Sequence, residues 1–198
     1  MRMLFASSDR DLLECFGKLF EPDGWETVTV FDGTQVISSL AKEKYDIVIL
    51  DRNIPRIEYK EVLTRIKKKN IPVIVLIYES VTPKILNEEL LPTSFLPFPF
   101  DPGKIRAVID NVMKRAMSVD TVKAAGAEID VSAFRLKNGP AVTAEETDVF
   151  ISVTEGKPLL AEEKVYISSL NAKLAGSGAK TRIKYISKKG FAAVAGNE

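Results

Sequence analysis

The sequence predicts an α/β fold, in which a five-stranded, doubly wound parallel sheet is followed by a small C-terminal α+β domain. Short apolar runs alternate with longer amphipathic stretches through the first 117 residues. This alternation is typical of parallel strands connected by helices that cover both faces of one sheet. The runs Ile47–Leu50 and Pro72–Ile77 are apolar throughout, as expected for central strands that helices bury on both faces.

The elements of the first domain follow from the spacing of its apolar residues. Strands are predicted at Met3–Ala6, Thr27–Val30, Ile47–Leu50, Pro72–Ile77 and Phe95–Leu96. Helices, in which apolar residues recur every three or four positions, are predicted at Asp9–Phe20, Thr34–Lys44, Tyr59–Lys69, Pro83–Leu91 and Pro102–Ala116. Functional groups of such a sheet gather at the carboxyl ends of its strands. Those ends are Ser7-Ser8, Asp51, Ile77-Tyr78 and Pro97-Phe98.

The C-terminal part has a different pattern. Ser118–Ala125 is small, polar and aperiodic, so we expect a linker between a domain of residues 1–117 and a second domain of residues 126–198. The second domain is expected to contain short strands, two helices and a final hairpin. They are placed at Ala127–Asp130 and Phe134–Lys137, at a helix opened by the capping-box spacing of Thr143 and Glu146, at Glu162–Leu174, and at Arg182–Ile186 with Phe191–Val194.

Composition excludes several classes of site. The chain has no histidine, which excludes zinc sites built on imidazole, Ser-His-Asp triads and a histidine phosphorelay. Cys15 is the only cysteine, and we expect it to be a buried structural thiol in a reducing compartment. The longest apolar run is far shorter than the roughly 20 residues of a membrane-spanning helix. We therefore expect a cytoplasmic protein with no metal, no cofactor and no enzymatic activity.

Two stretches resemble known families. Tyr45–Pro55, with Asp51 at its centre, resembles the phosphoacceptor strand and loop of a receiver domain, and Phe98-Pro99-Phe100 resembles the Lys-Pro-Phe signature of that domain. Val165–Leu174, followed by Ile186–Phe191, is similar to the recognition helix and wing of OmpR/PhoB-type winged-helix domains. The chain as a whole therefore resembles a response regulator with an atypical phosphorylation site and a shortened effector domain.

The resemblance implies a role for each residue of the receiver site. Asp51 matches the phosphoacceptor, and Asn53 the residue whose backbone carbonyl binds magnesium in the family. The other positions have lost the expected chemistry: Ser7 and Ser8 replace the acidic pair, Ile77 the Thr/Ser, Phe98 the Lys, and Phe95 occupies the aromatic switch position.

These replacements predict that phosphoryl transfer is lost. The reaction concentrates negative charge, which magnesium and lysine must neutralise, and neutral hydroxyls are poor ligands for this cation. Asp9 is one residue beyond the serines and is a partial substitute at best. We expect Asp51 to remain as an exposed carboxylate near Arg52 or Arg56, and Ile77 and Phe98 to fill the former pocket with hydrocarbon.

The C-terminal domain carries a local excess of basic residues. Between Lys164 and Gly190 every charged residue is basic, and such a patch attracts nucleic-acid phosphates; a solvated basic face fits the sequence equally well. The DNA-binding candidates are Lys164, Tyr166, Ser169, Asn171, Lys173, Arg182, Lys184, Lys188 and Lys189. Only Lys157–Ala161 separates the two helices, which is too short for the positioning helix of the family.

Two functions therefore stay open. The first is a phosphorylation-independent transcription regulator that binds double-stranded DNA. The second is an adaptor that binds other signalling proteins, and the missing positioning helix supports it. By resemblance, we also expect a homodimer through the fourth helix, fifth strand and fifth helix, which are Pro83–Leu91, Phe95–Leu96 and Pro102–Ala116.

Overall fold

A five-stranded parallel sheet with the order β2-β1-β3-β4-β5 forms the first half of the molecule. The structure is a computed structural model that describes residues 1–86, 90, 92–117, 121–179, 181–186 and 190–195. The strands are β1 (Arg2–Ala6), β2 (Glu26–Val30), β3 (Ile47–Asp51), β4 (Val73–Ile77) and β5 (Ser94–Pro97). All residues of β3 and β4 are buried, which agrees with their apolar sequences, Asp51 at the end of β3 being the exception.

Helices connect these strands in sequence. They are α1 (Arg10–Phe20), α2 (Gly33–Lys42), α3 (Tyr59–Lys67), α4 (Pro83–Leu86) and α5 (Pro102–Ala116), and a short 3₁₀ turn, Glu21–Asp23, follows α1. Asp9 and Asp32 cap α1 and α2, because their side chains accept hydrogen bonds from the first-turn amides of Leu12 and Gln35.

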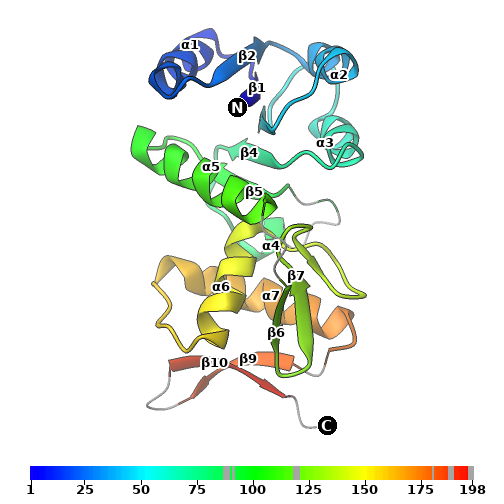
Figure 1. Cartoon of the computed structure of the whole chain (residues 1–198), viewed down its shortest axis with the longest axis vertical. Helices are drawn as coiled ribbons and strands as arrows, with labels where there is room; N and C mark the ends of the chain where they lie inside the picture. Colours follow the sequence, from blue (N-terminus) through cyan, green and yellow to red (C-terminus); the bar gives the residue numbers. More distant parts are fainter. Residues whose placement is uncertain (87–89, 91, 118–120, 180, 187–189, 196–198) are drawn as a thin grey trace. The chain divides into compact units, whose positions relative to one another are not determined.

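The helices form pairs on the sheet. Figure 1 shows α2 and α3 side by side, and a Cβ on Gly33 of α2 would lie 3.0 Å from Val62 of α3. Helices α1 and α5 form the other pair. The guanidinium of Arg106 in α5 donates a hydrogen bond to the Leu19 carbonyl of α1 at 2.8 Å. The five strands and their covering helices confirm the predicted α/β architecture.

The second half of the chain contains antiparallel strands and helices (Figure 1). Its elements are β6 (Thr121–Ala124), β7 (Ala127–Asp130), β8 (Arg135–Leu136), α6 (Ala144–Thr154), a 3₁₀ turn at Glu162–Lys164, α7 (Val165–Gly176), β9 (Thr181–Ile186) and β10 (Gly190–Ala195). Strands β6, β7 and β8 form one sheet, and β9 and β10 form a hairpin. The predicted capping box is confirmed, since Thr143 and Glu146 bond reciprocally.

Contacts between residues divide the chain into two units. The first comprises Met1–Ser80 and Ser94–Met113, and the second comprises Val81–Thr93 and Lys114–Glu198. The segment that connects β4 with β5 is thus grouped with the C-terminal residues. Within the second unit, the Ala144 amide donates to the Thr93 carbonyl at 2.8 Å, so this segment is bonded to the start of α6.

Three expectations differ from the structure. Strand β6 lies inside the stretch expected to be a linker; Ala125 and Gly126, both at positive φ, turn the chain so that β6 pairs with β7. Cys15 is exposed on α1 rather than buried, because the neighbouring Leu13 and Phe16 face the core instead. Helix α4 ends at Leu86, and residues 87–89 and 91 of its predicted range lie outside the described residues.

Within the described ranges, no helix is both long enough and apolar enough to span a bilayer.

Candidate functional site

Asp51 ends the central strand β3 and is the centre of the first candidate site. Its side chain is buried, with 3% of its surface exposed. Oδ2 accepts hydrogen bonds from the Ser7 hydroxyl at 2.7 Å and from the Tyr78 hydroxyl at 2.9 Å. Oδ1 accepts from the Asn53 amide at 2.8 Å. The expectation of an exposed carboxylate is therefore wrong, because three donors from β1, β4 and the β3 loop compensate its burial.

The two arginines expected near Asp51 have other acidic partners. Arg52 forms an ion pair with Glu79 at 2.9 Å, and Arg56 lies 3.3 Å from the carboxylate of Asp32. The donors bonded to Asp51 are consequently neutral. This matters for the chemistry of the site, since neutral donors satisfy a carboxylate without supplying the positive charge that phosphoryl transfer requires.

Tyr78 is the residue of this site that the sequence analysis did not single out. It directly follows β4, and its ring packs against Phe98 with the centroids 5.4 Å apart. Burial, and then the hydrogen bond to Asp51 and the charge of that carboxylate, raise the pKa of Tyr78 to about 12. Its position at the carboxyl end of β4 was the signal in the sequence that could have identified it.

The remaining receiver positions differ in their burial. Ile77 is fully buried within β4, and Phe95 is buried with 7% of its surface exposed. Phe98 is 37% exposed, so the expected filling of the pocket by Ile77 and Phe98 together is wrong; the Tyr78 side chain reaches Asp51 instead. Ser8 is exposed, and the Asp9 carboxylate caps α1 rather than replacing the missing acids.

These residues do not fit a magnesium ion. The cation prefers several oxygen ligands, including carboxylates, in octahedral geometry, whereas Asp51 is bonded to two hydroxyls and one amide. No group of three or more acidic, cysteine or histidine side chains with the geometry to hold a metal occurs in the described part of the chain.

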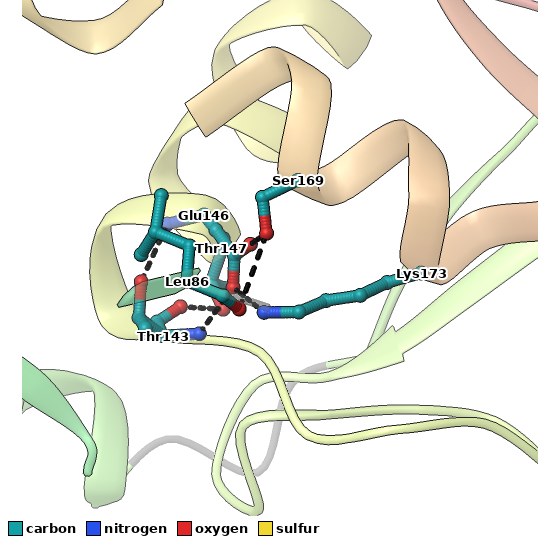
Figure 2. A network of polar contacts seen from close by, with 6 residues as sticks. All are labelled: Leu86, Thr143, Glu146, Thr147, Ser169 and Lys173. Carbon is teal, nitrogen blue, oxygen red and sulfur yellow. Dashed lines mark hydrogen bonds and ion pairs between the residues drawn. The ribbon is translucent and has the colours of Figure 1, made fainter. Parts of the chain in front are cut away.

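The second candidate site is a buried polar network in the second unit (Figure 2). Glu146 of α6 is fully buried. Its Oε1 accepts from the Ser169 hydroxyl at 2.7 Å, and its Oε2 accepts from Lys173 Nζ at 2.5 Å and from the Thr143 amide at 2.8 Å. Desolvation lowers the pKa of Lys173, although the nearby Glu146 charge acts in the opposite direction. The network joins α6 to α7 through a buried ion pair.

This network corrects the assignment of the recognition-helix candidates. Ser169 and Lys173 were expected to face DNA, yet they are buried and point toward Glu146 (Figure 2). Asn171 is also engaged, because its side-chain amide donates to the Ile183 carbonyl at 3.0 Å and its carbonyl accepts from the Ile183 amide at 2.7 Å. These three side chains hold α7 to α6 and β9 instead of reaching outward.

The other candidates differ in their accessibility. Tyr166 is half-buried, and its pKa is raised by burial and by the surrounding glutamates, foremost Glu145. Lys164 and Lys184 are exposed, whereas Arg182 is half-buried and donates to the Thr181 carbonyl at 2.6 Å. Lys188 and Lys189 lie outside the described residues.

Helix α4, part of the expected dimer surface, contacts α7 of the same unit. Ile85 and Leu86 are buried, and the Leu86 carbonyl lies 3.3 Å from the Ser169 hydroxyl (Figure 2). The apolar side of α4 is therefore covered within the second unit. The expected α4–β5–α5 interface loses this part of its surface.

The comparisons with known proteins agree with this architecture. The sequence profile of the response regulator receiver domain matches residues 4–110. The chain is 29% identical over 119 residues to the transcriptional regulatory protein TctD of Salmonella typhimurium, a match that covers 59% of this chain and 53% of TctD. It thus spans about half the length of TctD.

One further relative and one solved structure extend the match into the C-terminal half. The transcriptional regulatory protein PrrA of Mycobacterium bovis is 26% identical over 167 residues, which cover 79% of this chain and 72% of PrrA. The solved structure of a single-residue mutant of RitR has a TM-score of 0.64 at 19% identity, over 98% of this chain and 99% of that one. The latter likeness supports the fold of both halves.

We predict that Tyr78→Phe changes how stability depends on pH. Folded Tyr78 keeps its proton to a pH of about 12, whereas an unfolded tyrosine loses its proton near pH 10. The stability that protonated Tyr78 contributes to the folded wild type is therefore complete below about pH 10 and is lost as the pH rises through about 12. Denaturant unfolding from pH 8 to 12 should show a smaller decline in Tyr78→Phe than in the wild type. Equal pH slopes would show that the pKa of Tyr78 is not raised in the folded protein.

We predict that Lys173→Ala lowers the free energy of unfolding by about 3–5 kcal/mol, because it leaves the Glu146 carboxylate buried without its cation. Lys184→Ala is the matched control on the exposed side of the same unit, and should change stability by less than about 0.5 kcal/mol. Urea denaturation followed by circular dichroism measures both. A similar small effect of the two substitutions would show that the Glu146–Lys173 pair is not formed.

Proposed function

Because the chain belongs to the response regulator receiver domain family, we propose that it is a transcription regulator whose receiver unit works without phosphoryl transfer. The observation that carries this proposal is the Asp51 carboxylate, which is buried and accepts hydrogen bonds from the Ser7 hydroxyl, the Tyr78 hydroxyl and the Asn53 amide. The receiver unit is then a fixed scaffold rather than a phosphorylation switch.

The physical argument concerns the charge that a phosphoryl group adds. An aspartyl phosphate carries several anionic oxygens, and its formation requires cations that approach the transferred group. Ser7 and Ser8 supply no charge, and Phe98 occupies the position of the family's lysine. Reaction at Asp51 would also break its hydrogen bonds to Ser7 and Tyr78, and leaving the fully buried Ser7 hydroxyl without this partner costs about 1–3 kcal/mol.

DNA binding in this proposal relies on phosphate contacts more than on base reading. The relatives TctD and PrrA are named as transcriptional regulatory proteins, which supports the assignment by similarity. In α7, the exposed residues Ser168, Ala172 and Ala175 are small and uncharged, and the polar residues Ser169 and Asn171 bond internally. In this proposal the exposed Lys164 and Lys184, together with Lys188 and Lys189, attract the DNA phosphates.

A second function, a protein-interaction adaptor, is favoured by one observation. The outward residues of α7 present an uncharged surface of small side chains, and this composition suits contact with a protein surface better than contact with phosphates. The two functions differ in their dependence on salt, since only DNA binding releases condensed counterions.

The proposal retains four expectations from the sequence. The protein is cytoplasmic, it forms a homodimer, it requires no cofactor, and a receiver domain precedes a winged-helix-like domain. The degenerate positions Ser7, Ser8, Ile77, Phe95 and Phe98 are then part of a pseudo-receiver.

We predict that acetyl phosphate with Mg²⁺ leaves the wild-type protein unmodified, because the described donors to Asp51 are neutral and supply no positive charge to stabilise the phosphorylated product. Intact mass spectrometry detects an adduct, and Asp51→Asn is the negative control. A variant that restores the family's residue types, with Ser7→Asp, Ser8→Asp, Ile77→Thr and Phe98→Lys, is the positive comparison. A magnesium-dependent adduct on wild-type Asp51 would refute the proposed mechanism.

We predict that Lys164→Ala combined with Lys184→Ala weakens binding to all DNA sequences alike. Each phosphate contact contributes about 0.9 to the slope of log K against log salt, so the double variant should flatten the slope by roughly two units. Fluorescence anisotropy on random duplex DNA measures the slope, and Lys42→Ala in the first unit is the matched control. Absence of wild-type binding at low salt would favour the adaptor function.

A further inference from the structure

Strand β2 forms a free edge of the parallel sheet. It pairs with β1 and stands at the end of the strand order. The Glu26 amide donates to Met1, and the Val30 carbonyl accepts from Ser7. Peptide groups alternate in direction along a strand, so those of Thr27 and Thr29 point away from β1 toward the open edge.

This edge has few of the features that usually protect exposed strands. Natural edges are blunted by charged side chains, by proline or by bulges that twist them away. Glu26 at the start of β2 forms an ion pair with Arg2 at 3.0 Å, but the rest of the strand, Thr27–Val30, contains no charged residue and no proline, and it pairs with β1 in unbroken register. The backbone donors and acceptors of Thr27 and Thr29 are therefore available to another strand.

A groove of about 530 Å³ lies beside this edge, between β2 and α1. Trp25, Thr27, Thr29 and Phe31 line its strand side, and Phe31 is 39% exposed. Thr27 Oγ1 is buried and, among the described residues, has no hydrogen-bond partner. An added strand would place its alternate side chains in this groove and bring a hydroxyl partner to Thr27.

Gly17 keeps the helix side of the groove open. It lies within α1 and lines the groove, and a Cβ at this position would meet no atom within 4 Å. Glycine inside a helix is about 1 kcal/mol less favourable than alanine, and no close packing explains it here. A side chain at Gly17 would extend into the space beside β2.

The edge is complementary to itself. We consider two β2 strands that pair antiparallel with Val28 opposite Val28 of a second copy. Thr27 of each copy then lies opposite Thr29 of the other, and both pairs are hydrogen-bonded pairs. Trp25 then faces Phe31 of the second copy on the groove side. Paired threonines and paired aromatic residues are both favourable across antiparallel strands.

The charges of the groove are complementary in the same arrangement. Arg10 lies over the Phe31 ring at one end, 5.4 Å from its centroid, and Glu21 lines the groove with Trp25. Neither forms an ion pair within the described ranges, whereas Glu14 and Lys18 between them are paired at 2.6 Å. Antiparallel pairing brings the Arg10 end of each copy to the Glu21 end of the other.

We propose that the β2 edge and its groove form the homodimer interface of this protein, joining two sheets into one through an antiparallel β2–β2 contact. The inference rests on the homodimer of the proposed function and replaces the α4–β5–α5 surface, part of which contacts α7. It is independent of DNA binding and of the chemistry at Asp51.

The first test removes the backbone donor that the fold itself does not use. Thr29→Pro deletes an amide that points to the free edge, where proline is tolerated, and Thr29→Val is the matched control that keeps the amide. Sedimentation equilibrium of the full chain should show a dimer in the wild type and in Thr29→Val. The dissociation constant should rise at least about tenfold in Thr29→Pro, because two backbone hydrogen bonds of the interface are lost.

The second test exchanges charges and does not depend on the stability of the proline variant. Arg10→Glu and Glu21→Arg each place like charges at both ends of a homodimer and should each weaken it about tenfold or more. An equimolar mixture of the two variants pairs opposite charges at both ends. Native mass spectrometry should therefore show a heterodimer of the two, in preference to either homodimer.

The outcomes separate this interface from the homodimer itself. A wild-type dimer that withstands Thr29→Pro and the charge changes, but is lost in Ala107→Glu on the exposed face of α5, overturns the β2 interface and retains the homodimer. A wild type that stays monomeric at high micromolar concentration overturns both. The DNA-binding and phosphodonor measurements of the proposed function remain valid in each case.

Discussion

A carboxylate can stay buried at the end of a central strand only if hydrogen-bond donors surround it, and this requirement shapes the carboxyl edge of the parallel sheet. Asp51 accepts hydrogen bonds from the Ser7 hydroxyl at the end of β1 and from the Tyr78 hydroxyl at the end of β4. The strands on both sides of β3 are thus joined at one point. All three donors to Asp51, the Ser7 hydroxyl, the Tyr78 hydroxyl and the Asn53 amide, are neutral groups.

The same requirement organises the second unit around Glu146. The buried Glu146 carboxylate accepts hydrogen bonds from Ser169 and Lys173, which point inward from α7, and from the Thr143 amide. Breaking such a buried pair is costly even where its net contribution to stability is small. The residues that make α7 polar in sequence are consequently the residues that attach it to the protein. The exposed side chains of α7 are small and uncharged.

Much of the fold followed from the sequence, because it depends on local patterns. The continuous apolar runs of β3 and β4 and the 3.6-residue periodicity of α1 and α5 reflect burial on known faces. The Thr143 capping box was correctly predicted, since its hydrogen bonds join residues three positions apart. Strand β6 was missed because its pairing depends on a turn at Ala125, a residue that rarely adopts positive φ.

The sequence by itself determined the order of strands and helices, the family resemblance and the position of Asp51 at a strand end, because each is encoded in short segments. Only the tertiary structure decided what surrounds Asp51, and which polar residues of α7 face inward. Tyr78 meets Asp51 across 27 positions, and Lys173 meets Glu146 across 27 positions as well. The direction in which a polar side chain points depends on such distant partners, which hydrophobic periodicity does not reveal. The hydrogen-bond partners at Asp51 and at Glu146 were therefore decided by tertiary packing.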